Sequence, residues 1–172
     1  MIHYLRGDAT KPQGKGPKII AHICNDAGGW GAGFVMAISA RWPEPEKAYR
    51  EWAVSKTSGG QPFALRAVQY VQVEPDLWVA NMIAQTGYGT PDRPPIRYDA
   101  LRECLKTLAI PDGSIHMPRI GCGLAGGDWA SVEAVIKETL SHREVFVYDF
   151  EGASERVHNV HNRDVSGHSG TL

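Results

Sequence analysis

Two glycine-rich segments constrain this chain most, because each lies between an apolar run of strand length and a segment of helical periodicity. They read NDAGGWGAG at residues 25–33 and GCGLAGG at residues 121–127. A strand, a glycine loop and a helix in this order point backbone N–H groups and a positive helix end at a phosphate. Two such loops in one chain indicate a ligand with two phosphates, or a single phosphate held from both sides.

The composition indicates one ordinary domain of a water-soluble protein. The chain has 172 residues and a formal net charge of −1, so it lacks the overall basic charge usual for duplex nucleic acid binding. No apolar run approaches a membrane span, and the first residues lack a signal-peptide pattern. The three cysteines are an odd number without metal-like spacing. We therefore expect a reduced, cytoplasmic setting, no membrane contact, no metal ion and no cofactor. A monomer is the default expectation.

The periodicity predicts strands that alternate with helices. Strands are expected at residues 2–5, 18–24, 77–84, 114–118 and 144–150, with one long strand or two pieces at 63–73 and a hairpin turn at 74–76. Helices are expected from Phe34, ended by Pro43 and Pro45, and at residues 46–54, 98–108 and 129–140. Residues 86–97 predict a loop, a candidate lid over a site. This pattern favours an α/β fold with a mixed sheet and helices on both faces.

Two common nucleotide-binding motifs do not fit the glycine segments. Neither segment matches G-x-x-x-x-G-K-[ST], and neither contains a lysine, which disfavours a P-loop. A dinucleotide-binding fingerprint is expected after the first strand, with an acid at a strand end further on. Here the first segment follows the second strand, and Glu44 and Glu46 come after a helix.

The residues around both segments resemble the macrodomain family. The matching stretches are HICNDAGGWGAGF at residues 22–34 and MPRIGCGLAGGDW at residues 117–129, and the second is the more specific. More narrowly, the chain resembles the branch that holds terminal ADP-ribose protein glycohydrolase, the antitoxins that strip ADP-ribose from DNA, and yeast ADP-ribose-1″-phosphate phosphatase. The resemblance covers residues 1–150 and implies a three-layer α/β/α macrodomain with about six central strands. Residues 151–172 predict a mobile polar tail.

The resemblance implies ADP-ribose as the ligand. Asp8 matches the acid that binds the adenine amino group, although a turn-forming role is the alternative. Asn25 matches the position that faces the distal ribose. Phe150 is expected to stack on adenine, with Tyr148 as the alternative. The remaining binding candidates cradle the diphosphate and distal ribose or end the strand at 77–84; they are Gly29, Trp30, Gly31, Ala32, Gly33, Phe34, Gln85, Gly121, Cys122, Gly123, Leu124, Ala125 and Gly126.

The match breaks where the glycohydrolases of this branch carry their catalytic groups. They use a lysine near Gln85 or Thr86, but this chain has none between Lys56 and Lys106. Ala125 replaces their acid in the second segment. A lysine-based covalent mechanism is therefore not supported.

His22 and Asp128 are the catalytic candidates that remain. His22 matches a histidine implicated in the yeast phosphatase and suits acid–base chemistry, with a buried structural histidine as the equal alternative. Asp128 precedes a helix, so its alternative role is an N-cap. Asp26 is a further candidate. No base adjoins Cys24 or Cys122, so we expect no nucleophilic cysteine.

Three functions follow from the resemblance. The first is binding of ADP-ribose with hydrolytic removal of ADP-ribosyl groups from protein carboxylates or nucleobases. The second is an ADP-ribose-1″-phosphate phosphatase, and the third is a non-catalytic reader of ADP-ribosylation. The implied partners are ADP-ribose and ADP-ribosylated protein or nucleic acid.

Overall fold

The middle layer of the molecule is a six-stranded mixed sheet with the strand order β1-β8-β7-β2-β6-β5. The computed structural model describes residues 1–90, 92–108 and 111–150, so the tail expected at 151–172 lies outside the described residues. The strands are β1 (Ile2–Arg6), β2 (Lys18–Asn25), β5 (Val68–Glu74), β6 (Leu77–Gln85), β7 (Ser114–Met117) and β8 (Val145–Asp149). A separate small hairpin pairs β3 (Thr57–Ser58) with β4 (Gln61–Pro62).

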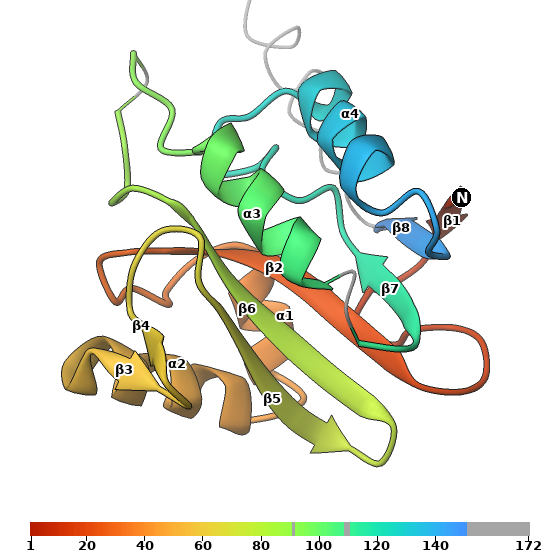
Figure 1. Cartoon of the computed structure of the whole chain (residues 1–172), viewed down its shortest axis with the longest axis horizontal. Helices are drawn as coiled ribbons and strands as arrows, with labels where there is room; N and C mark the ends of the chain where they lie inside the picture. The colour runs from red at the N-terminus through yellow and green to blue at the C-terminus, as the bar shows by residue number, and fades with distance from the viewer. Residues whose placement is uncertain (91, 109–110, 151–172) are drawn as a thin grey trace, which may run out of the picture.

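Helices cover both faces of this sheet, as the sequence predicts (Figure 1). One face carries α1 (Phe34–Ser39) and α2 (Glu44–Ser55), and the other carries α3 (Tyr98–Leu108) and α4 (Trp129–Thr139). The three-layer α/β/α architecture is thereby confirmed. Within the described residues no helix has the length and apolar character that crossing a bilayer requires.

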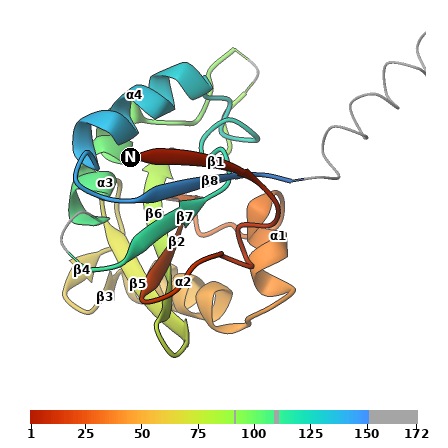
Figure 2. The same cartoon turned by 90° about the vertical axis from the view of Figure 1, so that its right-hand side faces the viewer.

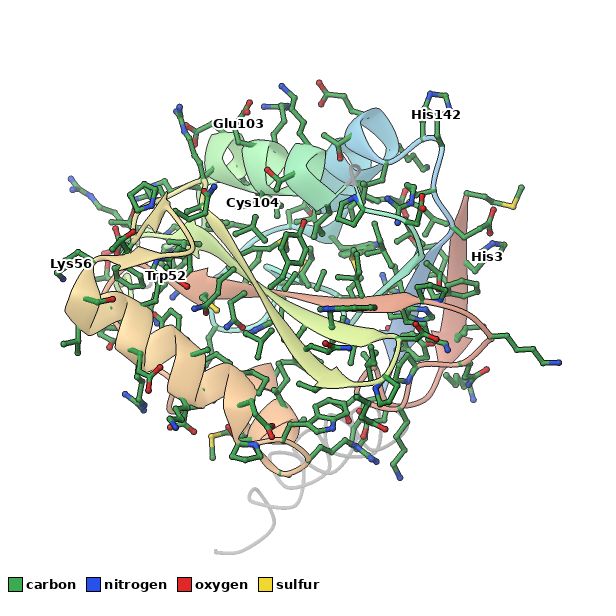
Figure 3. All side chains as sticks on the ribbon, turned by 60° about the horizontal axis from the view of Figure 1, so that its bottom comes forward. His3, Trp52, Lys56, Glu103, Cys104 and His142 are labelled. Carbon is green, nitrogen blue, oxygen red and sulfur yellow. The ribbon has the colours of Figure 1, made fainter. Side chains whose placement is uncertain are left out.

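The alternation of side chains along the central strands builds two apolar cores, one per face. Ile19 of β2 packs with buried leucines of α3 on one side, and the adjacent Ile20 packs with Tyr49 and Trp52 of α2 on the other. In Figure 3, Trp52 and Cys104 lie between helix and sheet, whereas Glu103 lies on the outer side of α3. Burial of these apolar groups is the main driving force that joins the layers.

Strand direction determines where the loops of this fold meet. β1, β8, β7, β2 and β6 all run parallel, and only β5 is antiparallel to its neighbour β6. β5 and β6 form the expected hairpin, and Asp76 in its turn has a φ of 57°. Figure 2 shows β1 beside β8 at the opposite border of the sheet. The carboxyl ends of the five parallel strands therefore share one edge of the sheet.

Two predicted boundaries are wrong. α1 ends at Ser39, before the prolines that were expected to end it. The prolines instead begin α2: Pro43 precedes it and Pro45 lies in its first turn, where a missing N–H group costs nothing. Residues 63–67 are not a strand. The chain turns there, with a φ of 82° at Arg66, and β5 begins only at Val68.

Candidate ligand site

The predicted binding residues gather along the edge where the parallel strands end. Asp8 follows β1, Phe150 follows β8, and the second glycine segment follows β7. The first glycine segment follows β2, and Gln85 ends β6. In open α/β sheets this edge is where ligands bind. The site thus runs across the sheet from the β1 and β8 side to the β6 side.

The side-chain amide of Asn25 holds the first glycine loop in shape. Its Oδ1 accepts hydrogen bonds from Ala27 N at 2.9 Å, Gly29 N at 3.1 Å and Tyr49 Oη at 2.9 Å, and its Nδ2 donates to Gly29 O at 3.0 Å. Among the described residues the second N–H of Nδ2 has no acceptor. Asn25 therefore organises the loop as much as it faces the site.

Backbone N–H groups of both loops are available to an anion. Gly31, Ala32 and Gly33 in the first loop and Gly123 and Leu124 in the second are exposed. Within the described part of the chain, none of their N–H groups has a hydrogen-bond acceptor. Successive N–H groups of this kind form a concave surface that attracts phosphate oxygens.

The two loops approach each other across the site. Gly33 has a φ of +85°, and a Cβ built on it would lie 3.4 Å from Leu124 Cδ1. Inside the second loop, Gly127 N donates to Gly121 O at 2.6 Å, and a Cβ on Gly127 would lie 2.4 Å from that oxygen. Glycine is required at Gly127 for this close approach. The loops are thus packed rather than loosely extended.

His22 and Trp30 are buried beneath the first loop. The His22 side chain is about 2 % exposed, its Nε2 lies 2.5 Å from Asn81 Oδ1, and burial lowers its pKa to about 4 against the opposing effect of that hydrogen bond. The Trp30 ring packs edge-on to His22 at 5.3 Å between centroids, and its Nε1 donates to Ser39 Oγ. Both side chains occupy structural positions in the core, with Phe34 packed beside them.

Asp8 and Phe150 lie at the β1 and β8 side. Asp8 Oδ1 accepts from Thr10 N at 2.8 Å and from Thr10 Oγ1 at 2.7 Å, the turn that the alternative predicts. Asp8 also lines an open cavity of about 550 Å³ together with Arg41 and Trp42. Phe150 is 56 % exposed.

Tyr148, the alternative to Phe150, is buried. Its hydroxyl accepts from Gln13 N at 2.8 Å and lies 2.8 Å from His116 Nδ1. Of the two aromatic candidates, only Phe150 presents its ring to the surface.

Asp128 caps α4. Its Oδ2 accepts from Ser131 N at 3.2 Å and from Ser131 Oγ at 2.9 Å, which is the geometry of an N-cap. In the same loop, burial raises the pKa of the Cys122 thiol, and its Sγ donates to Ile120 O. The Cys122 thiol is therefore not held as an activated nucleophile.

The two positions expected to carry a lysine and an acid from the resemblance to the glycohydrolase branch hold a polar and a small side chain in this chain. Gln85 Nε2 donates to Gly87 O at 2.9 Å. Ala125 is buried, and its carbonyl accepts from Ile96 N at 3.2 Å. Gly121 and Gly126 pack on Ile96 and Pro94, which belong to the connection between β6 and α3. Sequence reasoning missed Tyr49, Asn81 and Tyr88, which lie outside both glycine segments.

Solved structures resemble this chain closely. A protein of unknown function from Bacteroides thetaiotaomicron is 54 % identical with a TM-score of 0.81, and the match covers 87 % of this chain and 98 % of that one. A macrodomain protein from Streptomyces coelicolor is 50 % identical with a TM-score of 0.75, over 87 % and 99 % of the two chains.

More distant sequences also align, whereas no family model matches. ADP-ribose 1″-phosphate phosphatase of Lodderomyces elongisporus is 26 % identical over 148 residues, which are 78 % of this chain and 90 % of that protein. Mouse chromodomain-helicase-DNA-binding protein 1-like is 30 % identical over 99 % of this chain, and the match spans 20 % of its length. At 50 % identity over nearly the whole of a solved macrodomain protein, this chain belongs to the macrodomain family.

Proposed function

We propose that this protein binds ADP-ribose and hydrolytically removes ADP-ribosyl groups from modified carboxylates or nucleobases. One observation carries the proposal. Two glycine loops meet at one sheet edge, where Gly33 lies beside the Leu124 side chain, and their exposed N–H groups have no acceptor in the described residues. A diphosphate has the size and charge to use both loops at once.

The sheet edge gives the ligand a direction. In this proposal the N–H groups of residues 31–33 and 123–124 bind the diphosphate. Adenine lies at the β1 and β8 side, where Asp8 has one carboxylate oxygen beyond its turn and Phe150 offers an exposed ring. The distal ribose then lies at the β6 side, near Asn25 and Gln85.

The proposed chemistry is attack of water on C1″ of the distal ribose. The bond from C1″ to the carboxylate oxygen or to the nucleobase breaks, the water oxygen becomes the C1″ hydroxyl, and the leaving group receives a proton. Fixed diphosphate and ribose hold C1″ in place, and such positioning lowers a barrier substantially without a covalent lysine. His22 contributes by supporting Trp30 beneath the first loop, because its ring is buried and its depressed pKa keeps it neutral at pH 7.

The test combines binding with release from three substrates. ADP-ribose binding is measured by calorimetry, and an ADP-ribosylated protein, an ADP-ribosylated DNA and ADP-ribose 1″-phosphate are then incubated with the protein. Release of ADP-ribose from the protein or DNA supports the proposal. Binding without any turnover selects the reader instead.

A pair of charge variants tests whether the loops are the site. A Cβ on Gly123 would meet nothing within 4 Å, so Gly123→Glu adds a carboxylate to the loop without a clash. It should weaken ADP-ribose binding about 100-fold or more, because opposing like charges costs several kcal/mol. Ser141→Glu, an exposed position at the other edge of the sheet, should bind normally. Equal affinity in both variants would rule out the loops.

The phosphatase remains a second candidate because the Lodderomyces elongisporus relative bears that name. It predicts phosphate release from ADP-ribose 1″-phosphate.

A further inference from the structure

The connection from β6 to α3, residues 86–97, folds back on itself beside the β6 end of the site. We call this connection the wall. Thr86 N donates to Pro95 O at 2.9 Å. Thr90 and Arg93 exchange two backbone hydrogen bonds of 3.2 and 3.0 Å. The described part of the loop is therefore ordered by its own backbone contacts rather than held only at its ends.

This wall is attached to both glycine loops. On the first side, Asp26 N donates to Gln85 O at 2.9 Å and Gly87 N donates to Asp26 Oδ1 at 2.8 Å. On the second side, Ile96 N donates to Ala125 O at 3.2 Å. The connection therefore borders both glycine loops.

Tyr88 belongs to the wall, and its side chain lies over the first glycine loop. The hydroxyl end of the Tyr88 ring lies in the space that a Cβ on Gly29 would occupy, so the ring contacts the first loop at this glycine. The side chain is nevertheless 67 % exposed. Among the described residues the Tyr88 hydroxyl has no hydrogen-bond partner, whereas the backbone of the preceding Gly87 is bonded to Gln85 Nε2 and Asp26 Oδ1.

We propose that Tyr88 stacks on a nucleobase attached to C1″ of the distal ribose and so selects nucleobase-linked ADP-ribose over peptide-linked ADP-ribose. This inference rests on the proposed function, which puts the distal ribose at the β6 side. An exposed phenol ring offers a flat apolar face, and every nucleobase has a matching face. An aliphatic carboxylate side chain has none. Stacking on aromatic side chains is a general way to bind unpaired bases.

The observed packing gives Tyr88 a fixed position for this role. The hydroxyl end of its ring lies over Gly29, and the residue before it is held by the hydrogen bond from Gly87 N to Asp26 Oδ1. A pre-positioned ring loses little freedom on binding, so its contact contributes directly to affinity. Tyr88 is then a specificity-determining residue whose effect appears only when a group is attached at C1″.

The experiment compares three ligands across four proteins. The ligands are free ADP-ribose, an oligodeoxynucleotide with one ADP-ribosylated base, and a peptide with one ADP-ribosylated glutamate. The proteins are wild type, Tyr88→Ala, Tyr88→Phe and the control Tyr70→Ala, a partly exposed tyrosine on β5. Affinity is read as Kd, or as kcat/KM where the conjugate is hydrolysed.

Tyr88→Ala should weaken recognition of the DNA conjugate about tenfold or more, the usual effect of removing one stacking ring. ADP-ribose and the peptide conjugate should change less than about twofold, because neither contacts the ring face. Tyr88→Phe keeps the ring and should resemble wild type, as should Tyr70→Ala. A wild type that binds no ADP-ribose refutes the proposed function itself. If wild type binds it, equal losses for all ligands, a larger loss for the peptide, or no loss would each overturn the inference alone.

Discussion

At the scale of single residues, polar side chains inside a glycine motif serve either the ligand or the loop. His22, Asn25 and Trp30 all belong to the stretch that resembles macrodomains, and the sequence analysis names all three as site candidates. In the structure His22 and Trp30 are in the core, and most of the Asn25 amide is used on its own loop. A motif therefore predicts the position of a site better than it predicts which side chains face the ligand.

The buried His22 makes stability depend on pH. Its pKa is lowered from the ordinary 6.5 to about 4, so the unfolded chain binds more protons than the folded one between these values. The contribution of neutral His22 to the free energy of unfolding is fully present above pH 6.5 and is lost as the pH drops toward 4. Between pH 7 and 5 this single group should cost about 2 kcal/mol. His116, whose pKa burial also lowers to about 4, adds to the slope.

The contribution of His22 is isolated with His22→Gln, which keeps a donor for Asn81 Oδ1 but cannot be charged. Urea unfolding at pH 7 and pH 5 gives the free energy of unfolding for both proteins. The variant should lose less stability than wild type over this interval. Identical losses would mean that His22 does not titrate as a buried group.

At the scale of elements, two variants of Asp128 can distinguish its structural role as a helix cap from a catalytic role. As the N-cap of α4 it accepts from Ser131, so Asp128→Ala should lower the free energy of unfolding by about 1 kcal/mol. Asp128→Ser preserves a capping oxygen and should restore that stability. If Asp128 acts only as a cap, Asp128→Ser also keeps turnover. Loss of turnover in a fully stable Asp128→Ser would instead assign it to catalysis.

The ends of helices and strands were predictable where the apolar periodicity agrees with the residues that start or stop an element. α3 matches the predicted residues 98–108, because its apolar residues recur at helical spacing and no proline or glycine interrupts them. Pro43 and Pro45 misled the prediction for α1, since a proline can begin a helix as well as end one. The apolar run at 63–67 is packed as a turn against the sheet, where Arg66 N donates to Ile83 O. The left-handed backbone at Arg66 interrupts the extended conformation there, whatever the strand propensity of the run.

At the scale of the whole molecule, the site follows from topology. Both glycine loops were predictable as strand-to-helix connections, and parallel strands bring such connections to one edge. The wall formed by the β6 to α3 connection was predicted only as a loop and candidate lid. Its contacts with both glycine loops depend on β6 lying beside β2, which no local pattern reveals.

The buried hydrophobic residues of the described structure all lie between Ala9 and Tyr148, and β8 ends at Asp149. Because the apolar cores supply most of the folding free energy, a chain ending at Phe150 should keep its melting temperature within about 2 °C, less than 1 kcal/mol for a domain of this size. Differential scanning calorimetry of the full chain and the shortened chain measures this.

ADP-ribose affinity should also be equal in both, since every proposed contact precedes Glu151. A large drop in melting temperature with intact affinity would show that residues 151–172 stabilise the domain. A loss of affinity alone would instead show that they contribute to the site.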